Sequence, residues 1–479
     1  MITPAGFLLI PIVVASIYRR SWALVCTLIS VPFTALELFY AVSHWFSFPE
    51  VALMALLVSH LLYMRREREL LLPASPPVYL LVGFVVVCFV SVVSLLFNPL
   101  DAMTHTYNTG PHRVFALSPI EFSITNMTQL VLRVFAIGAI VGLATVLSQY
   151  DVQRVLRLLI VCSLLVGVFG VFYQVTQTIE ARGIWKLANA FGLDIQEKSG
   201  GAFGFLPRMW TPAGEPGFGA SYFLYLFSLA ATLSFLPETR VASRKRLRIA
   251  TAGLFAVLIL STSTTAYGGL LVFGAVFLVA TVVSRRIATR SVVAVYGALL
   301  LGVLLLGGVI SMVTGLDVIA LLEPQLAKLQ FKAGSGTLRL RYIEMAFDLF
   351  PQRPLFGAGV GSYFGASLLG TLLAEIGLVG FAAFVLAHVS TYWECLRASR
   401  DRIDGQGSVA IALVVSSVVL LGSSLLAKSI STLMFPWFWL SLALPIALSL
   451  QSTGRSVSFD RIRQRYGHLT WWDRTQPDR

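Results

Sequence analysis

Residues 77–97 read PVYLLVGFVVVCFVSVVSLLF, a run that contains no charged side chain. In a helix that rises about 1.5 Å per residue, such a run is long enough to cross the roughly 30 Å hydrocarbon layer of a bilayer. Runs of this kind recur along the whole chain. The sequence therefore predicts an all-α polytopic membrane protein.

Composition supports this class, because 57% of the 479 residues are hydrophobic, 12% are charged and the mean hydropathy is +0.80. We expect about 13 spans. They are expected near residues 4–17, 22–41, 46–64, 77–97, 128–149, 158–177, 217–236, 249–262, 266–283, 291–313, 370–393, 409–427 and 432–450. Residues 1–450 would then form one transmembrane domain, in which 249–283 fits a tight hairpin.

Basic residues predict the orientation. Most of the 36 lysines and arginines fall in one set of short loops and in the polar tail 451–479. That side is expected to be cytoplasmic, since short cytoplasmic loops carry an excess of Lys and Arg. The net charge of +13 then reflects topology and contact with anionic lipid, and nucleic-acid binding is not expected.

Three loops on the outer side are long, at about 98–127, 178–216 and 314–369. Long loops in a compact protein are usually functional or disordered. These loops contain apolar residues at helical spacing, which predicts short amphipathic helices at residues 181–193 and 318–326 and a helix over 339–350. The four cysteines show no paired spacing, so neither a disulfide framework nor a metal site is expected.

The second outer loop ends in the segment Arg208-Met-Trp210-Thr-Pro-Ala-Gly-Glu215-Pro216. Pro216 disfavours helical backbone at Glu215, so the carboxylate is expected in extended backbone where the next span begins. An acidic residue at a helix N-terminus can simply interact with the helix dipole, and Arg208 can anchor a lipid headgroup. The presence of both in one short segment favours a functional interpretation.

The third outer loop contains Arg339, Arg341 and the series Gly357-Ala-Gly359-Val-Gly361. Arg341 is spaced to pair with Glu344 and Asp348 on one helix face, so Arg339 is expected to be the freer of the two arginines to meet a ligand. The glycines allow the backbone to approach closely or to bend sharply. Guanidinium groups in such loops suit a substrate that bears phosphate.

Ionisable residues also lie inside predicted spans, where they are costly. Glu37 and Arg133 both fall near outer ends, and a structural ion pair between them is one interpretation. For His60 and His388 we expect packed neutral imidazoles or a snorkelling position.

The chain resembles the O-antigen polymerase/ligase superfamily, which comprises Wzy-type polysaccharide polymerases and their ligase relatives. The similar stretches are Arg339-Leu-x-x-Ile343-x-x-Ala346-x-x-Leu349, Pro354-Leu-Phe-Gly357-Ala-Gly359-Val-Gly361, Ala374-Glu375-Ile-Gly377-Leu-Val-Gly380, Glu215-Pro216 and Ser261-Thr-Ser-Thr-Thr265-Ala-Tyr-Gly268-Gly. The last two are similar to exopolysaccharide polymerases in particular. Ligases carry a His-Asn pair where this chain has residues 365–370, without histidine.

Two further departures concern the polymerases. Many members have an arginine after the serine in the hairpin, where this chain has threonines. Some show Arg-x10-Gly in two outer loops. Arg208 to Gly219 fits that spacing, whereas the same distance from Arg339 reaches Phe350.

The resemblance implies a type C glycosyltransferase-like fold in a bacterial inner membrane, with the active site facing the periplasm. Its donor would be a glycan on undecaprenyl diphosphate. Arg208 and Arg339 would then hold the diphosphate, and Glu215 would deprotonate the acceptor hydroxyl. Arg341, Trp210, Gly359 and Gly361 would contribute to substrate binding.

No cofactor or metal is expected, since no Asp-x-Asp cluster appears. Partners would be the lipid-linked oligosaccharide, membrane lipid and a chain-length regulator. Two alternatives stay open: an O-antigen-type ligase that transfers glycan to a lipid or protein, and a polytopic transporter. A transporter would require a pair of broken spans, one in each half of the chain. The break at Ser261–Gly269 could be one member of such a pair, and no second member is clear.

Overall fold

The computed structural model describes most of the chain. The described residues are 2–41, 44–67, 75–105, 117–179, 183–193, 209–236, 240–284, 335–363, 365, 367–400, 405–427 and 435–452, with 297, 308 and 312 as single residues. Apart from those three residues, the expected span at 291–313 therefore lies outside the described residues, as do the helix at 318–326, Arg208 and the tail from 453.

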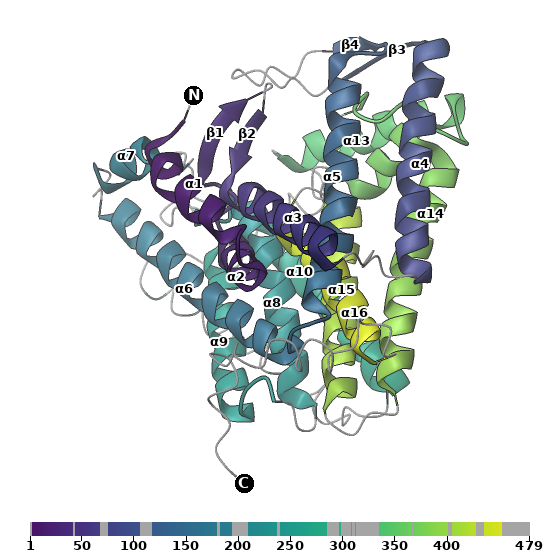
Figure 1. The fold of residues 1–479 in the computed structure, drawn as a ribbon. Helices are drawn as coiled ribbons and strands as arrows, with labels where there is room; N and C mark the ends of the chain where they lie inside the picture. Colours follow the sequence, from purple (N-terminus) through teal and green to yellow (C-terminus); the bar gives the residue numbers. More distant parts are fainter. Residues whose placement is uncertain are drawn as a thin grey trace.

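The protein is a helical membrane bundle, as expected (Figure 1). Eight of the described helices are long and apolar enough to cross a bilayer. They are α3 (Phe48–Glu67), α4 (Pro76–Phe97), α5 (Ile124–Leu147), α6 (Val152–Thr178), α8 (Pro216–Phe235), α10 (Thr264–Ser284), α14 (Leu368–Ser399) and α15 (Gln406–Ala427). Shorter helices among the described residues also belong to the bundle: α1 (Pro4–Ser16), α2 (Arg20–Ser30), α9 (Arg244–Leu260) and α16 (Pro436–Ser452).

Helix α8 lies at the centre of the core. Its side chains are buried on every face from Pro216 to Ser234, apart from a partly exposed Phe218, and it packs against α9, α10 and α15. Helix α16 packs along α5 and α14, and its tryptophans Trp437 and Trp439 are fully buried. A helix that is apolar all round belongs in the interior of a membrane bundle.

The expected span at 22–41 is wrong. Helix α2 ends at Ser30, and an 11-residue helix covers only about half of the hydrocarbon layer. Pro32 lacks the amide that would continue the helix. The chain then forms a hairpin of β1 (Glu37–Ala41) and β2 (His44–Ser47), in which the Phe39 and Phe46 rings stack with centroids 4.7 Å apart.

A second hairpin, β3 (Leu100–His105) with β4 (Leu117–Ile120), occupies the first long outer loop. Both hairpins lie at one end of the bundle, together with the short helix α7 (Gly183–Ala190) and with α13 (Ser335–Leu349) (Figure 1). We call this the hairpin end. The helices expected at 181–193 and 339–350 are thus present as α7 and α13, whereas the two hairpins were not expected.

The two intramembrane histidines are packed, as expected. His388 is buried between aromatic rings, with its ring centroid 4.3 Å from that of Phe384, and its Nδ1 lies 2.8 Å from the Phe384 carbonyl oxygen. His60 is also buried.

The basic loops predict that the hairpin end lies outside the cytoplasm. A cysteine introduced at the exposed position Glu121 should react with a membrane-impermeant maleimide in spheroplasts. A cysteine at Arg246, at the start of α9, should react only after permeabilisation. Labelling of the native protein gives the background from its four free cysteines. The opposite pattern of labelling would reverse the assigned orientation.

Candidate functional site

The segment before α8 forms a tight turn against the turn that follows α2. Gly214 adopts φ +99° and its amide donates to the Thr211 carbonyl over 2.9 Å. The Ala35 amide donates to the Pro212 carbonyl over 2.8 Å. These bonds fix the backbone that carries Glu215.

Glu215 stands at the mouth of α8 with its side chain exposed. Its backbone is extended (φ −57°, ψ 157°), as Pro216 at the first helical position predicts. The carboxylate does not cap the helix by a hydrogen bond. It lies where the N-terminal helix dipole favours a negative charge, and it is accessible to a ligand.

Trp210, five residues earlier, is buried with 8% of its surface exposed. It belongs to an aromatic cluster with Tyr173 and Trp185, whose ring centroids are 4.7 Å apart. The Trp185 indole also donates to the Thr176 hydroxyl over 2.9 Å. In this structure Trp210 therefore anchors the segment to α6 and α7.

Helix α13 carries the two predicted arginines of the last outer loop. Arg341 is exposed and forms no ion pair with Glu344 or Asp348, all three of which the structure describes. Arg339 is half-buried and has interactions of its own. The expected contrast between the two is thus reversed: Arg341 is the more accessible cation.

Helix α13 is held in place from its other side. Ala346 and Leu349 pack in a small core with Leu95, Ile120, Ala358, Tyr363 and Ala374. The Tyr363 hydroxyl donates to the Tyr342 carbonyl, and burial raises the pKa of the Tyr342 phenol above its ordinary value. These contacts join α13 to the start of α14 and to the ends of α4 and β4.

The glycine series Gly357, Gly359 and Gly361 docks onto a break in α14. All three have positive φ, and so does Gly377 inside α14 (φ +63°, ψ −167°). A Cβ at Gly357 would lie 2.3 Å from the Glu375 carbonyl carbon, and one at Gly377 would lie 2.5 Å from the Leu355 carbonyl carbon. Only glycine fits such close backbone contacts at positive φ.

The two segments exchange backbone hydrogen bonds at this break. The Ala358 and Gly359 amides donate to the Ala374 and Glu375 carbonyls over 2.8 and 3.0 Å. In the other direction, the amides of Leu378 and Val379 donate to the carbonyls of Pro354 and Leu355 over 2.7 and 3.1 Å. The loop thus supplies partners for backbone groups that a continuous helix would satisfy internally.

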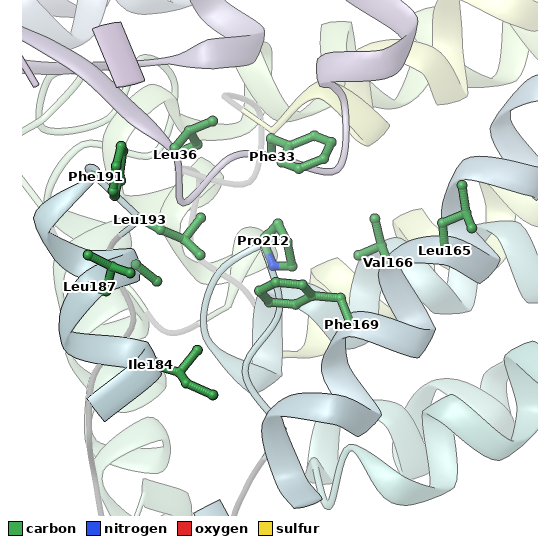
Figure 2. A pocket seen from close by; sticks show the side chains of 11 residues that line it. Phe33, Leu36, Leu165, Val166, Phe169, Ile184, Leu187, Phe191, Leu193 and Pro212 are labelled. Atoms are coloured by element: carbon green, nitrogen blue, oxygen red, sulfur yellow. The ribbon is translucent and has the colours of Figure 1, made fainter. Parts of the chain in front are cut away.

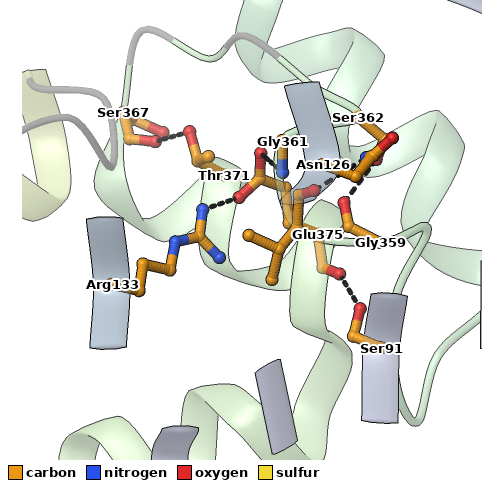
Figure 3. Close-up of polar contacts among 10 residues, drawn as sticks. Ser91, Asn126, Arg133, Gly359, Gly361, Ser362, Ser367, Thr371 and Glu375 are labelled. Atoms are coloured by element: carbon orange, nitrogen blue, oxygen red, sulfur yellow. Dashed lines mark hydrogen bonds and ion pairs between the residues drawn. The ribbon is translucent and has the colours of Figure 1, made fainter. Parts of the chain in front are cut away.

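Glu375 and Arg133 form a buried ion pair beside this break (Figure 3). The Glu375 side chain is 0% exposed and the Arg133 side chain is 3% exposed. The carboxylate also accepts from the Gly361 amide over 2.9 Å, and the Glu375 carbonyl accepts from the Ser91 hydroxyl over 2.5 Å. Asn126 of α5 donates to the Val360 carbonyl over 2.7 Å, so α5 and α14 both hold the loop, while Ser91 joins α4 to α14 at the break.

The ion pair expected between Glu37 and Arg133 is therefore wrong. Glu37 lies in β1, and the partner of Arg133 is Glu375, 242 residues along the chain. Glu375 did carry a signal in the sequence, since a carboxylate inside an apolar span requires a partner. Arg353 is a second residue that no sequence pattern indicated. It lies half-buried beside the ends of α4 and η1 (Phe350–Gln352), near the Ser94 and Pro99 carbonyls at 3.5 Å.

The structure thus gives two groups of candidate residues. Glu215 and Trp210 lie at the start of α8, and the group of Arg339, Arg341, Gly359 and Gly361 lies around α13 and the start of α14. Helix α16 packs near the start of α8, at Tyr222, but it meets α14 further along, at Phe384 and His388. Its neighbour Phe435 packs on Phe218 of α8 at 4.5 Å, and α16 itself packs on α14 and α5. Within the described residues, no three His, Cys, Asp or Glu side chains are grouped as metal ligands.

Removal of one partner of the buried pair is expected to destabilise the protein strongly. Glu375→Ala or Arg133→Ala should each lower the free energy of unfolding by about 3–5 kcal/mol, because the remaining charge is left buried and unpaired. The double variant Arg133→Met with Glu375→Leu should be less destabilised than either. Denaturant unfolding of the purified protein measures both effects, and single variants as stable as the native chain would contradict the assignment.

Residues 249–370 match the family model described as O-antigen ligase. This segment runs from α9 through α10 and α13 to the start of α14, and it includes Arg339, Arg341, Gly359 and Gly361. Glu215 precedes it and Glu375 follows it. A search of the curated proteins found no match. The matched segment confirms the resemblance of this chain to the O-antigen polymerase/ligase superfamily.

Proposed function

We propose that this protein is an inner-membrane polysaccharide polymerase that acts at the hairpin end of the bundle. It transfers a growing glycan from undecaprenyl diphosphate to a hydroxyl group on an incoming lipid-linked repeat unit. The observation that carries the proposal is the match of residues 249–370 to an O-antigen ligase family, because that segment contains the exposed cation Arg341 and its neighbour Arg339.

The candidate residues suit the charges that develop in such a transfer. The bond between the anomeric carbon of the donor and the diphosphate oxygen breaks, and the electron pair leaves with the diphosphate. Arg339, Arg341 and Arg208 supply guanidinium groups that match the geometry and charge of that leaving group. Helix α13 is fixed by its packing on α14, which is how a binding site keeps its cations oriented before the substrate arrives.

Glu215 is the candidate general base. As the acceptor oxygen bonds to the anomeric carbon, its proton passes to the Glu215 carboxylate. The role is supported by the exposure of the carboxylate and by its fixed extended backbone at the mouth of α8. A general base must reach the proton that it removes, and a carboxylate engaged in capping a helix would be less able to do so.

An O-antigen-type ligase is the second candidate, because the matched family is described by that activity. The transfer chemistry is the same, but the acceptor is a finished lipid or protein instead of another repeat unit. Residues 365–370 contain no histidine where ligases carry a His-Asn pair, and this favours the polymerase.

Substitution of the candidate residues in cells tests the proposal. Glu215→Gln is expected to lower the transfer rate at least roughly 100-fold, the usual loss when a general base is removed. Arg339→Ala and Arg341→Ala should lower it by about 10–1000-fold through lost stabilisation of the leaving group. Polymer length, measured by gel electrophoresis of the extracted glycan, should collapse to single repeat units.

The controls are Glu121→Gln, an exposed carboxylate at the same end, and Arg246→Ala, an exposed cation at the start of α9. Both should give polymer of native length. If instead the deletion strain accumulates long polymer on the lipid carrier, the protein is a ligase. Native polymer from the Glu215 and arginine variants would refute the candidate site.

A further inference from the structure

An apolar cavity of about 540 Å³ lies between α6, α7 and the segment that precedes α8 (Figure 2). Val166 and Phe169 of α6 form one wall, the apolar side of α7 forms another, and Phe33 and Leu36 approach from the turn after α2. Every described residue that lines the cavity is apolar. A ligand that fills it must be a hydrocarbon, since a polar group would lose its hydrogen bonds to water there.

Helix α7 presents a continuous apolar stripe to this cavity. Ile184, Leu187, Ala188 and Phe191 follow one another at helical spacing, so they share one face. Beside this stripe, the buried Trp185 packs on Phe169 at 5.5 Å and holds α7 against α6. The stripe itself stays accessible, with Leu187 61% exposed. Apolar side chains are stabilised by contact with other hydrocarbon, so the stripe favours an apolar ligand.

One side of the cavity is continuous with the surface of α6 that faces lipid. Leu165 lines the cavity and is 66% exposed, and Val168 and Val161 are exposed on the same helix. Exposed aliphatic residues on a spanning helix face the hydrocarbon of the bilayer. A lipid chain can therefore enter the cavity sideways without passing through water.

The other side of the cavity meets the candidate active site. Pro212 lines the cavity, and Glu215 is exposed three residues further along the same fixed turn. The hydrogen bond from the Ala35 amide to the Pro212 carbonyl holds that turn against residues 33–36, of which Phe33 and Leu36 also line the cavity. A ligand with a hydrocarbon tail in the cavity would thus carry its polar head towards Glu215.

We propose that this cavity binds the polyprenyl chain of the lipid-linked substrate, in the stretch next to the diphosphate. The proposal rests on the proposed function and adds the site at which the carrier lipid is held. At roughly 30 Å³ for a group the size of a water molecule, the cavity of about 540 Å³ has room for about 18 carbon-sized groups, or three to four isoprene units. A single chain fits this space, whereas a diacyl phospholipid would leave one of its two chains outside.

A cavity-filling substitution tests the proposal on the purified full-length protein in lipid nanodiscs. The probe is undecaprenyl diphosphate without sugar, and its affinity is measured by native mass spectrometry. Ala188→Trp should weaken binding at least about tenfold, because each buried methylene that is displaced is worth about fourfold in affinity. Ala190→Trp is the matched control, since Ala190 is exposed on the same helix and does not line the cavity. It should bind as the native protein does.

Inorganic diphosphate has no hydrocarbon chain, so its affinity measures the contribution of the headgroup alone. Its affinity should be unchanged in Ala188→Trp, and a loss equal to that for undecaprenyl diphosphate would overturn the proposal. Ile184→Ser is a second variant in case Ala188→Trp does not fold, as judged by thermal unfolding. It shortens an exposed wall residue and should weaken binding of undecaprenyl diphosphate alone.

The remaining outcomes distinguish this proposal from the proposed function. If the native protein binds undecaprenyl diphosphate and both cavity variants bind it equally well, the chain lies elsewhere and only the cavity assignment fails. If phosphatidylglycerol binding falls as much as undecaprenyl diphosphate binding in Ala188→Trp, the cavity takes bulk lipid and the assignment also fails. If the native protein does not bind undecaprenyl diphosphate, both the proposed function and the cavity assignment fail.

Discussion

The buried ion pair between Arg133 and Glu375 is the interaction on which the hairpin end of the bundle depends. It lies where α14 is broken at Gly377, and a broken helix inside a membrane leaves backbone groups that must find partners in the protein. The loop 354–361 supplies those partners, and three glycines at positive φ let it approach closely enough. One charged pair thus joins α5 to α14 and fixes the loop that leads from α13.

This arrangement separates residues that hold the structure from residues that are available to a substrate. Glu375, Arg133 and the glycines are buried or engaged with backbone, and they hold the loop that follows α13. Arg341 and Glu215 are exposed at the same end, on elements that this framework and the Thr211–Gly214 turn keep in place. The apolar cavity beside Pro212 then gives a lipid-linked molecule a place for its tail close to its reacting head.

The helical membrane fold was predictable from the sequence, because long uncharged runs such as residues 77–97 have few alternatives in a bilayer. The span at 22–41 failed since hydropathy sums over residues and does not register that Pro32 ends a helix or that Phe39 can pair with Phe46. Pairing across 242 residues is equally invisible to local pattern, so the sequence offered Glu37, which also falls near an outer end, as one interpretation for the partner of Arg133. The glycine series was expected to allow a close approach or a sharp bend, but its close neighbours could not be foreseen: they are α14 at Gly357, α4 at Gly359 and α5 at Gly361.

The central claim is that the α13 arginines and Glu215 serve one lipid-linked diphosphate. An electron cryomicroscopy structure of the protein with undecaprenyl diphosphate bound tests it most directly. The claim predicts diphosphate density at the hairpin end within hydrogen-bonding distance of Arg339 or Arg341, with the first isoprene units running past Pro212. Density for the diphosphate at the opposite end of the bundle, or away from both arginines, would contradict it.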